Sequence, residues 1–335
     1  MSFGLFWRAS LATAAGLVFG FLALRFINEG DRSSPSQNSF IPRLSLIRQA
    51  STGELISLEI GPFEVGPNDF RVTLLNAVGK PQKLSSARLR FSRMEARTVV
   101  DEVDSTPAGQ SRQSSVDLSG PGWWQIEVIV NTDSTAPFYL KLDQPSSAPK
   151  SFAPPDYAPD AEAEQLFRVA LLRYESLTGL KQREELTSGD PGPSGHGIWF
   201  ITDINSNRDG YHATSLSMGQ GASELYSDPR RQCFRQGRDE WQCSEGAAPV
   251  GPFDLGYLQN ATGFKNGPQE PIDGEMTQTI FFYNGSQGAW YVWWIGEQSH
   301  YVRRQAMVAN GHFMLDRFSN HDAPVSIQPK DLPVQ

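Results

Sequence analysis

The sequence predicts a mainly β protein in three parts: a short apolar N-terminal segment, a small β-sandwich, and an α+β module in which a curved antiparallel half-barrel sheet wraps one long helix. Short runs with strand-like alternation, bounded by Gly, Pro, Asn or Asp, recur along most of the chain. One stretch, residues 159–180, instead repeats its apolar residues at helical spacing. Breaks rich in polar residues, Pro and Ser at residues 29–47 and 143–158 separate the parts.

Residues 1–28 are expected to form a membrane anchor. The stretch from Ala9 to Leu24 is uncharged, and an arginine at each end can reach the lipid head groups. No convincing A-x-A cleavage site follows, which favours an uncleaved signal anchor, a transmembrane helix, over a cleaved signal peptide. Residues 29–47 show no apolar periodicity and are predicted to be a flexible stalk.

Residues 48–142 are predicted to form an antiparallel sandwich with an immunoglobulin-like fold. Short alternating or apolar runs, among them LISLEI, FRVTLLNAVG and GWWQIEVIV, are each bounded by turn-forming residues. This pattern resembles the YtkA-like domain, which is also found at the C-terminal end of copper-transport proteins of the CopD type. The matching positions are Gly66-Pro67-Asn68 before a strand, Asn76 to Pro81 as the turn, and Gly122-Trp123-Trp124 at the entry to the last hairpin.

The YtkA-like resemblance implies a context of copper transport or copper resistance. The residues themselves offer little to a copper ion, because between Ser39 and Lys150 there is no His, no Cys and a single Met, Met94. Copper selects soft or imidazole ligands. The sandwich is therefore interpreted as a structural or docking module.

Residues 159–330 are predicted to form one long helix, stopped by Gly179, against a large antiparallel sheet. The expected strands begin with HGIWFITDI and end with HFMLDRFSN, and Asn310-Gly311 between the last two is a strong two-residue hairpin signal. The late strands TIFFYNGSQGAWYVWWIGEQSHYVRRQAM resemble the LolA/LprG-like lipoprotein-carrier fold, with Glu297 in place of the usual Asp of a W-[IV]-D-like turn. The resemblance implies a half-barrel that encloses an apolar cavity.

Cys233 and Cys243, the only cysteines, are expected to form a disulfide across a hairpin of this module. The residues between them are polar at the centre and good β formers in the arms, so the two cysteines should lie opposite each other. Opposed residues lie roughly 4.5–5.5 Å apart at Cα, within the reach of a disulfide. The chain has no C-x-x-C spacing and no second pair of cysteines, so the sequence suggests neither a redox site nor a zinc site. A lasting disulfide implies that the module lies outside the cytoplasm.

Large aromatic side chains on the sheet are the candidate cavity residues. Their combined aromatic surface exceeds what one helix can easily cover, so the surplus either fills a thick core or lines a pocket for a ligand. Period-2 alternation places aromatics on both faces of the sheet. The candidates are Trp199, Trp241, Phe281, Phe282, Trp290, Trp293, Trp294 and Phe313.

Metal binding, cofactor binding and catalysis are not predicted. Copper ligands could come from His300, His312, His321, Met307 and Met314, but the hairpin turn splits this set into two pairs; His196 and His212 are the remaining histidines. No nucleophile elbow, H-E-x-x-H, P-loop or dinucleotide-binding motif is present. The net charge of −8 and a pI near 5.2 argue against nucleic-acid binding.

These patterns lead to one leading hypothesis and two alternatives. The leading hypothesis is a non-enzymatic protein, anchored by a single pass in the bacterial cytoplasmic membrane with both modules in the periplasm or at the cell surface. Its half-barrel would bind a lipid or another hydrophobic ligand. The alternatives are an accessory protein of copper handling and a purely structural module that docks on a membrane-protein partner.

Overall fold

A computed structural model of the chain describes residues 42–131, 134–143, 155, 157–189, 197–245 and 253–332. The predicted anchor, residues 1–28, lies outside these ranges, as does most of the predicted stalk. No helix within them has the length and apolar character that crossing a bilayer requires.

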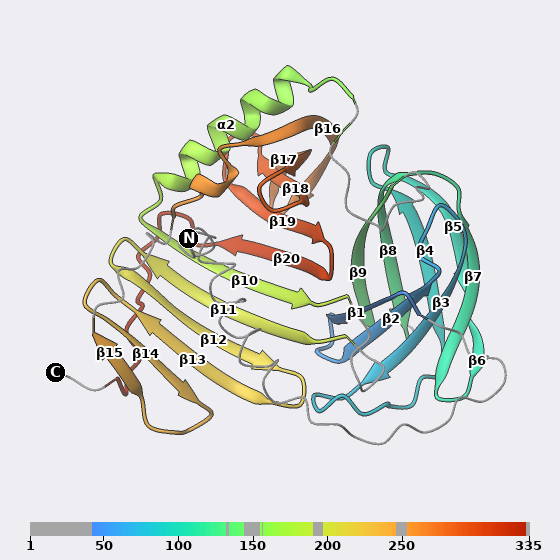
Figure 1. Ribbon diagram of the computed structural model, residues 1–335, viewed down its shortest axis with the longest axis horizontal. Helices are drawn as coiled ribbons and strands as arrows, with labels where there is room; N and C mark the ends of the chain where they lie inside the picture. The colour runs from blue at the N-terminus through green and yellow to red at the C-terminus, as the bar shows by residue number, and fades with distance from the viewer. Residues whose placement is uncertain are drawn as a thin grey trace, which may run out of the picture.

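The first half of the chain folds as a β-sandwich of two antiparallel sheets (Figure 1). One sheet has the order β1 (Leu44–Gln49), β2 (Leu55–Gly61), β3 (Gly66–Leu75), β7 (Ser111–Leu118), β6 (Thr106–Ala108). The other has the order β5 (Thr98–Asp104), β4 (Ala87–Arg93), β8 (Gly122–Val130), β9 (Ser134–Leu142). Inward side chains such as Phe70 and Phe91, with ring centroids 4.9 Å apart, fill the space between the sheets. The first strand begins at Leu44, inside the segment expected to be stalk.

One α-helix in the described ranges, α2 (Ala161–Glu175), follows the sandwich and is shorter than the sequence predicts. Asp160 caps its N-terminus by accepting hydrogen bonds from the backbone N–H groups of Glu162 and Ala163. The helix ends at Ser176 rather than at Gly179, because Asp322 accepts a hydrogen bond from the backbone N–H of Thr178 and holds the chain in a new direction. Gly179 instead opens a strand.

An eleven-stranded antiparallel sheet forms the rest of the protein. Its spatial order is β15-β14-β13-β12-β11-β10-β20-β19-β18-β17-β16. The strands are β10 (Gly179–Thr187), β11 (Trp199–Asn207), β12 (Gly210–Ser217), β13 (Gly221–Ser227), β14 (Arg231–Gln236), β15 (Gln242–Glu245), β16 (Ala261–Ile272), β17 (Glu275–Asn284), β18 (Ala289–Gly296), β19 (Val302–Ala309) and β20 (His312–Ser319). A short 3-10 helix, η1 (Gly256–Leu258), precedes β16.

Two hairpins of this sheet confirm the local predictions. Cys233 of β14 lies directly opposite Cys243 of β15, and the two are joined by a disulfide. Ala309 pairs with His312, so Asn310 and Gly311 form the expected two-residue turn.

The large sheet is covered differently on its two faces (Figure 1). Helix α2 packs over the β16–β20 end of one face, which we call the helix-side face. The sandwich packs against the opposite face, the sandwich-side face, through its edge strands β1 and β9. One continuous apolar core therefore includes both the interior of the sandwich and the sandwich-side residues of β17 to β20.

The junction between sandwich and sheet is close and specifically bonded. The backbone N–H of Ser45 in β1 donates to the Gly189 carbonyl at 2.8 Å, and the Gly197 N–H donates to the Ser45 hydroxyl at 3.0 Å. A Cβ at Gly197 would lie 2.6 Å from the Ser45 carbonyl oxygen, so only glycine permits this approach.

A buried ion pair joins the same two parts. Arg48 Nη1 donates to the Glu185 carbonyl at 2.9 Å and lies 3.6 Å from the Glu185 carboxylate. That carboxylate also accepts from Trp199 Nε1 at 2.8 Å and from the Gln49 backbone N–H. Burial lowers the pKa of Arg48, and the nearby Glu185 partly offsets this effect.

Candidate functional site

Most of the aromatic residues predicted to line a cavity pack toward the sandwich. Trp199, Phe281, Trp290, Trp294 and Phe313 lie on the sandwich-side face, and each is at most 2% exposed. Phe281 packs on Trp123 with ring centroids 5.9 Å apart, and Trp294 packs on Tyr139 at 5.5 Å. These five side chains form part of a thick core, which was the alternative to a pocket. They do so because the sandwich covers this face of the sheet.

The remaining predicted residues lie in two other places. Trp241 stands beside the guanidinium of Arg235, 4.6 Å from its ring centroid, near the disulfide hairpin. Phe282 and Trp293 lie on the helix-side face beneath α2. There the ring of Phe167 sits 4.8 Å from Phe282 and 5.1 Å from Trp293, which fills the space under the helix with aromatic rings.

A row of buried polar side chains crosses the helix-side face from strand to strand. Neighbours in this polar row are directly paired in register, and each is 5% exposed or less. Polar groups are rarely buried without a bonding partner, so such a row marks a place of special chemistry. Its members are Gln305, Asp316, Glu184, Thr202, Ser215 and Ser223.

Hydrogen bonds satisfy the two ends of the polar row but not its centre. Asp316 accepts from Gln305 Nε2 at 2.7 Å and from Gln182 Nε2 at 3.1 Å. On the other side, the hydroxyls of Thr202 and Ser215 are 2.8 Å apart and share a hydrogen bond. Between them, both carboxyl oxygens of Glu184 are buried and have no hydrogen-bond partner among the described residues.

Burial determines the protonation of the two adjacent carboxyls. Desolvation raises the pKa of Glu184 well above its usual value, and the neighbouring Asp316 raises it further. Desolvation likewise raises the pKa of Asp316 to about 7, although its bonds to Gln182 and Gln305 oppose the shift. Burial therefore favours the neutral, protonated form of Glu184.

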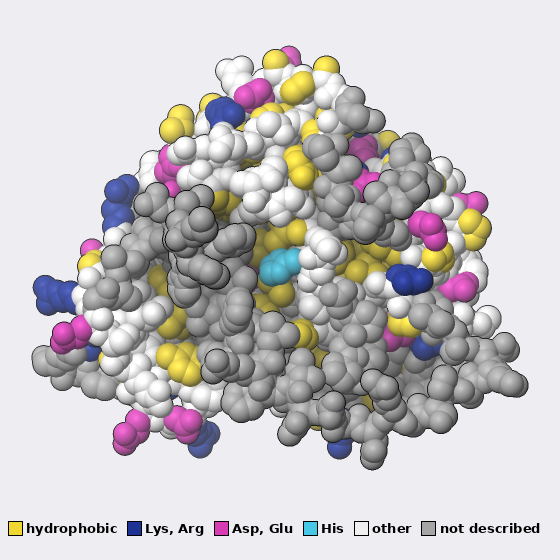
Figure 2. Space-filling model, viewed as in Figure 1, with side chains coloured by type: hydrophobic (Ala, Val, Ile, Leu, Met, Phe, Trp, Pro, Cys, Tyr) yellow, Lys and Arg dark blue, Asp and Glu magenta, His cyan; other side chains and the backbone are white. Residues whose placement is uncertain are grey.

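An apolar cluster lies beside the polar row on strands β11 to β14. It consists of Ile204, Tyr211, Ala213 and Leu225, with Phe234 packed against them, and we call it the wing cluster. Within the described residues, the hydrophobic neighbours in this cluster come from the sheet itself, whereas α2 packs at the β16–β20 end. Figure 2 shows a separate group of hydrophobic side chains around a histidine in the middle of the viewed face, where Figure 1 draws β19 and β20.

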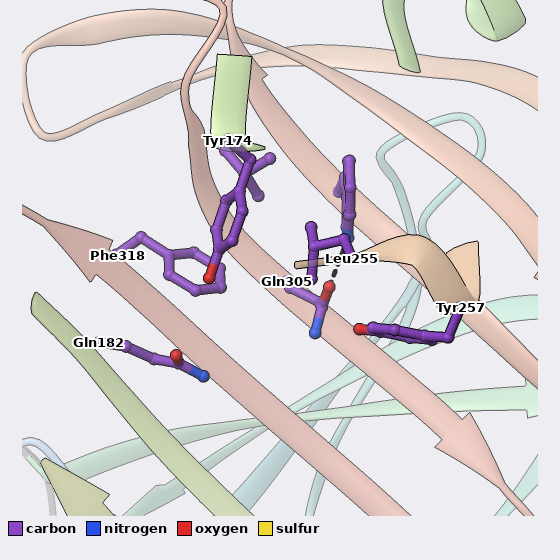
Figure 3. A pocket seen from close by; sticks show the side chains of 8 residues that line it. Tyr174, Gln182, Leu255, Tyr257, Gln305 and Phe318 are labelled. Atoms are coloured by element: carbon purple, nitrogen blue, oxygen red, sulfur yellow. Dashed lines mark hydrogen bonds between the residues drawn. The ribbon is translucent and has the colours of Figure 1, made fainter. Parts of the chain in front are cut away.

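A small cavity connects the polar row with the underside of α2. Its volume of about 20 Å³ is room for about one water molecule. Gln182 and Gln305 reach it from the sheet, while Tyr174 from α2 and Tyr257 from η1 point toward it from above (Figure 3). The other lining residues are Leu255, Trp293, Val302 and Phe318.

The histidines are dispersed across the sheet. His212 lies on the sandwich-side face, 3.0 Å from the Glu224 carboxylate, and His321 Nε2 lies 3.0 Å from the Val302 carbonyl. Burial lowers the pKa of His312 and of His321 to about 4. Within the described ranges no three His, Cys, Asp or Glu side chains meet in a metal-binding group, and His196 lies outside those ranges. Met307 and Met314 are cross-strand neighbours, as expected.

Comparisons with solved structures find proteins of similar fold. Lipoprotein LppX from Mycobacterium tuberculosis matches at 16% identity and a TM-score of 0.40, over 50% of this chain and 100% of its own. LprF from Mycobacterium bovis matches at 14% identity and a TM-score of 0.39, over 52% of this chain and 99% of its own. A LolA superfamily protein from Nitrosomonas europaea matches at 8% identity and a TM-score of 0.25, over 50% and 94%. These are likenesses of fold alone.

No family model matches the chain, and no curated protein matches it in sequence. The YtkA-like resemblance of the sandwich, and the copper context that it implies, stay predictions.

Sequence reasoning missed the residues of the polar row. Glu184, Thr202 and Ser215 look like solvent-facing positions in a strand, because charged and hydroxyl residues are usually exposed. The sequence carries little signal for Glu184, because only Leu180 and Leu186 are apolar on its face of the strand and the other face is polar as well.

Proposed function

We propose that this chain is a non-enzymatic binding protein that holds a lipid or another apolar molecule on the helix-side face of its large sheet. The observation that carries the proposal is the wing cluster: apolar side chains on one face of β11 to β14, themselves buried, bordered by a buried polar row. Apolar pockets with a few well-placed polar groups are the usual form of small-molecule sites.

The size of the wing supports an acyl chain as the ligand. Neighbouring strands are about 4.8 Å apart, so the five strands β10 to β14 span about 19 Å from first to last. One leaflet of a bilayer core is about 15 Å thick, which is the depth that one lipid chain fills in a membrane. An acyl chain lying across the strands would cover the wing cluster from Ile204 to Phe234.

The proposal assigns separate roles to the two halves of the chain. The sandwich, residues 48–142, supports the sheet from behind, and the module at residues 159–330 binds the ligand. We further propose that residues 1–28 anchor the chain in a bacterial cytoplasmic membrane, with both modules outside the cytoplasm, where the Cys233–Cys243 disulfide persists.

Lipid analysis of matched variants tests this proposal. The full chain is exported to an oxidising compartment, purified in a mild detergent and extracted with organic solvent, and the extracted lipid is quantified per mole of protein. Ala213→Phe should reduce the lipid bound, because the ring would fill the wing. Thr214→Phe is the control, since Thr214 is exposed on the opposite face of the same strand.

Lipid that associates with the N-terminal segment contributes equally to Ala213→Phe and Thr214→Phe, because that segment is the same in both variants. It therefore cancels in the difference between them. Equal lipid contents in the wild type and both variants would contradict a ligand site on the wing.

A further inference from the structure

The centre of the polar row holds an unused hydrogen-bonding group. Glu184 is fully buried, and within the part of the chain that the structure describes neither of its carboxyl oxygens has a hydrogen-bond partner. A buried polar group without a partner is unfavourable, and such groups in a native protein call for a specific reason. The row offers none internally, because Asp316 is bonded to Gln182 and Gln305, and Thr202 to Ser215.

The charges around Glu184 favour its neutral form. Asp316 of β20 is its cross-strand neighbour and is itself a buried acid. The phenol of Tyr174, on α2, is the other titratable group that interacts with Glu184. Arg48 acts on Asp316 from the opposite face of the sheet and is bonded to Glu185. A neutral carboxylic acid carries one donor, its O–H, and an acceptor, its C=O.

The position of Glu184 relates it directly to the wing cluster. Ile204 lies two residues from Thr202 on β11, and Ala213 lies two residues from Ser215 on β12, so the polar and apolar rows run side by side. Residues two apart on a strand are separated by about 7 Å. Glu184 and the wing cluster are buried in this structure, so a molecule that inserts against the wing cluster would bring a polar group next to Glu184.

We infer that Glu184 binds an uncharged hydroxyl group of the ligand, and so selects an amphiphile whose apolar chain covers the wing cluster. This inference rests on the proposed function. A hydroxyl donates to the C=O of Glu184 and accepts from its O–H, which satisfies both unpartnered oxygens at once. An ether or a hydrocarbon satisfies one or neither.

Binding of two matched probes to the full chain tests the inference. The probes are 1-dodecanol and 1-methoxydodecane, which share one apolar chain and differ in the hydrogen-bond donor. Dissociation constants are measured by tryptophan fluorescence titration. One hydrogen bond contributes about 1 kcal/mol, so wild type should bind the alcohol on the order of fivefold more tightly than the ether.

Variants at position 184 test whether the preference for the alcohol over the ether depends on Glu184. Glu184→Gln keeps a donor and an acceptor and should keep the preference, whereas Glu184→Leu should bind both probes equally. Glu162→Leu, on the exposed surface of α2, is the control and should behave as wild type. Circular dichroism of each variant confirms the fold before titration.

The outcomes separate the inference from the function on which it rests. If wild type binds both probes with equal affinity, the hydroxyl contact is wrong and the apolar site stands. If dodecylamine binds more tightly than 1-dodecanol, Glu184 recognises a cation and the inference is overturned. If none of these probes binds, the proposed function fails and the inference fails with it.

Discussion

Replacement of Glu184 by leucine should stabilise the protein, and the gain should grow with pH. The side chain lies at the centre of the polar row, fully buried, with no partner for either oxygen. Leucine removes this unfavourable burial and adds apolar surface to the helix-side face. Relief of one unsatisfied buried group contributes about 1–3 kcal/mol to the free energy of unfolding.

The pH dependence follows from the raised pKa of Glu184 in the folded protein. Below its ordinary value of about 4.5, the carboxyl is neutral in both the folded and the unfolded chain. Above that pH the unfolded carboxyl ionises while the folded one stays neutral, so the wild type loses stability as the pH rises towards the folded pKa. The loss is at most about 1.4 kcal/mol per pH unit and continues until the pH reaches the folded pKa.

Urea unfolding of wild type and Glu184→Leu at pH 5, 6 and 7 measures this difference. The wild-type profile alone does not isolate Glu184, because His312 and His321, whose pKa values are lowered to about 4, destabilise the fold as the pH falls below about 6.5. Both proteins contain these histidines, so their contribution cancels in the difference. A difference that stays constant with pH, or a variant less stable than wild type at pH 7, would refute the reasoning.

Three further substitutions test the packing by urea unfolding at pH 7. Phe281→Ala should lower the free energy of unfolding by about 3–5 kcal/mol, because the ring is 1% exposed in the core shared by sandwich and sheet. Replacing Cys233 and Cys243 together by serine should lower it by about 2–3 kcal/mol through loss of the short disulfide loop. Arg48→Met should lower it by about 3 kcal/mol, because Glu185 would stay buried without its cation.

Exposed residues provide the matched controls. Leu172→Ala, at a side chain 67% exposed on α2, should change the free energy of unfolding by less than about 1 kcal/mol. Arg88→Met, in an exposed ion pair with Glu102, should have a much smaller effect than Arg48→Met. A shared core is wrong if Phe281→Ala costs no more than Leu172→Ala. For the disulfide, a reductant acting on wild type should reproduce the effect of the double serine variant.

The sequence predicted those parts of the fold that depend on residues close together in the chain. The hairpins at Cys233–Cys243 and Asn310-Gly311 are set by turn residues and by alternation over a few positions on either side. The N-terminus of α2 is likewise a local matter of Asp160 and the acidic residues after it. The predicted C-terminus of α2, at Gly179, lies a few residues beyond the observed one. The contact that redirects the chain there comes from Asp322, which is distant in the sequence.

Strand β10 could not be recognised for a related reason. Its central residues, Lys181 to Glu185, are polar or charged, and such a run usually faces solvent. In the folded protein Glu184 and Glu185 are both buried, one beneath the helix-side face and one against the sandwich. Strand β16 was missed as well, since it contains Gly267 and Pro268 and its pairing with β17 is interrupted by irregularities.

The aromatic residues show how far composition can indicate a site. The sequence correctly placed aromatics on both faces of the sheet, but it gave no means of knowing what covers each face. Trp123 and Tyr139, which cover Phe281 and Trp294, precede them by more than a hundred positions. The wing cluster and the polar row, by contrast, contain few aromatic residues and attracted no attention.

Strand β10 joins the two faces of the sheet through consecutive residues. Glu184 points into the polar row, and Glu185 points the other way and holds Arg48, Gln49 and Trp199. A movement of this strand that brings Glu184 toward a bound molecule must also displace Glu185 from its bonds behind the sheet. Through these bonds, a displacement of β10 on the helix-side face would be transmitted to the sandwich on the opposite face.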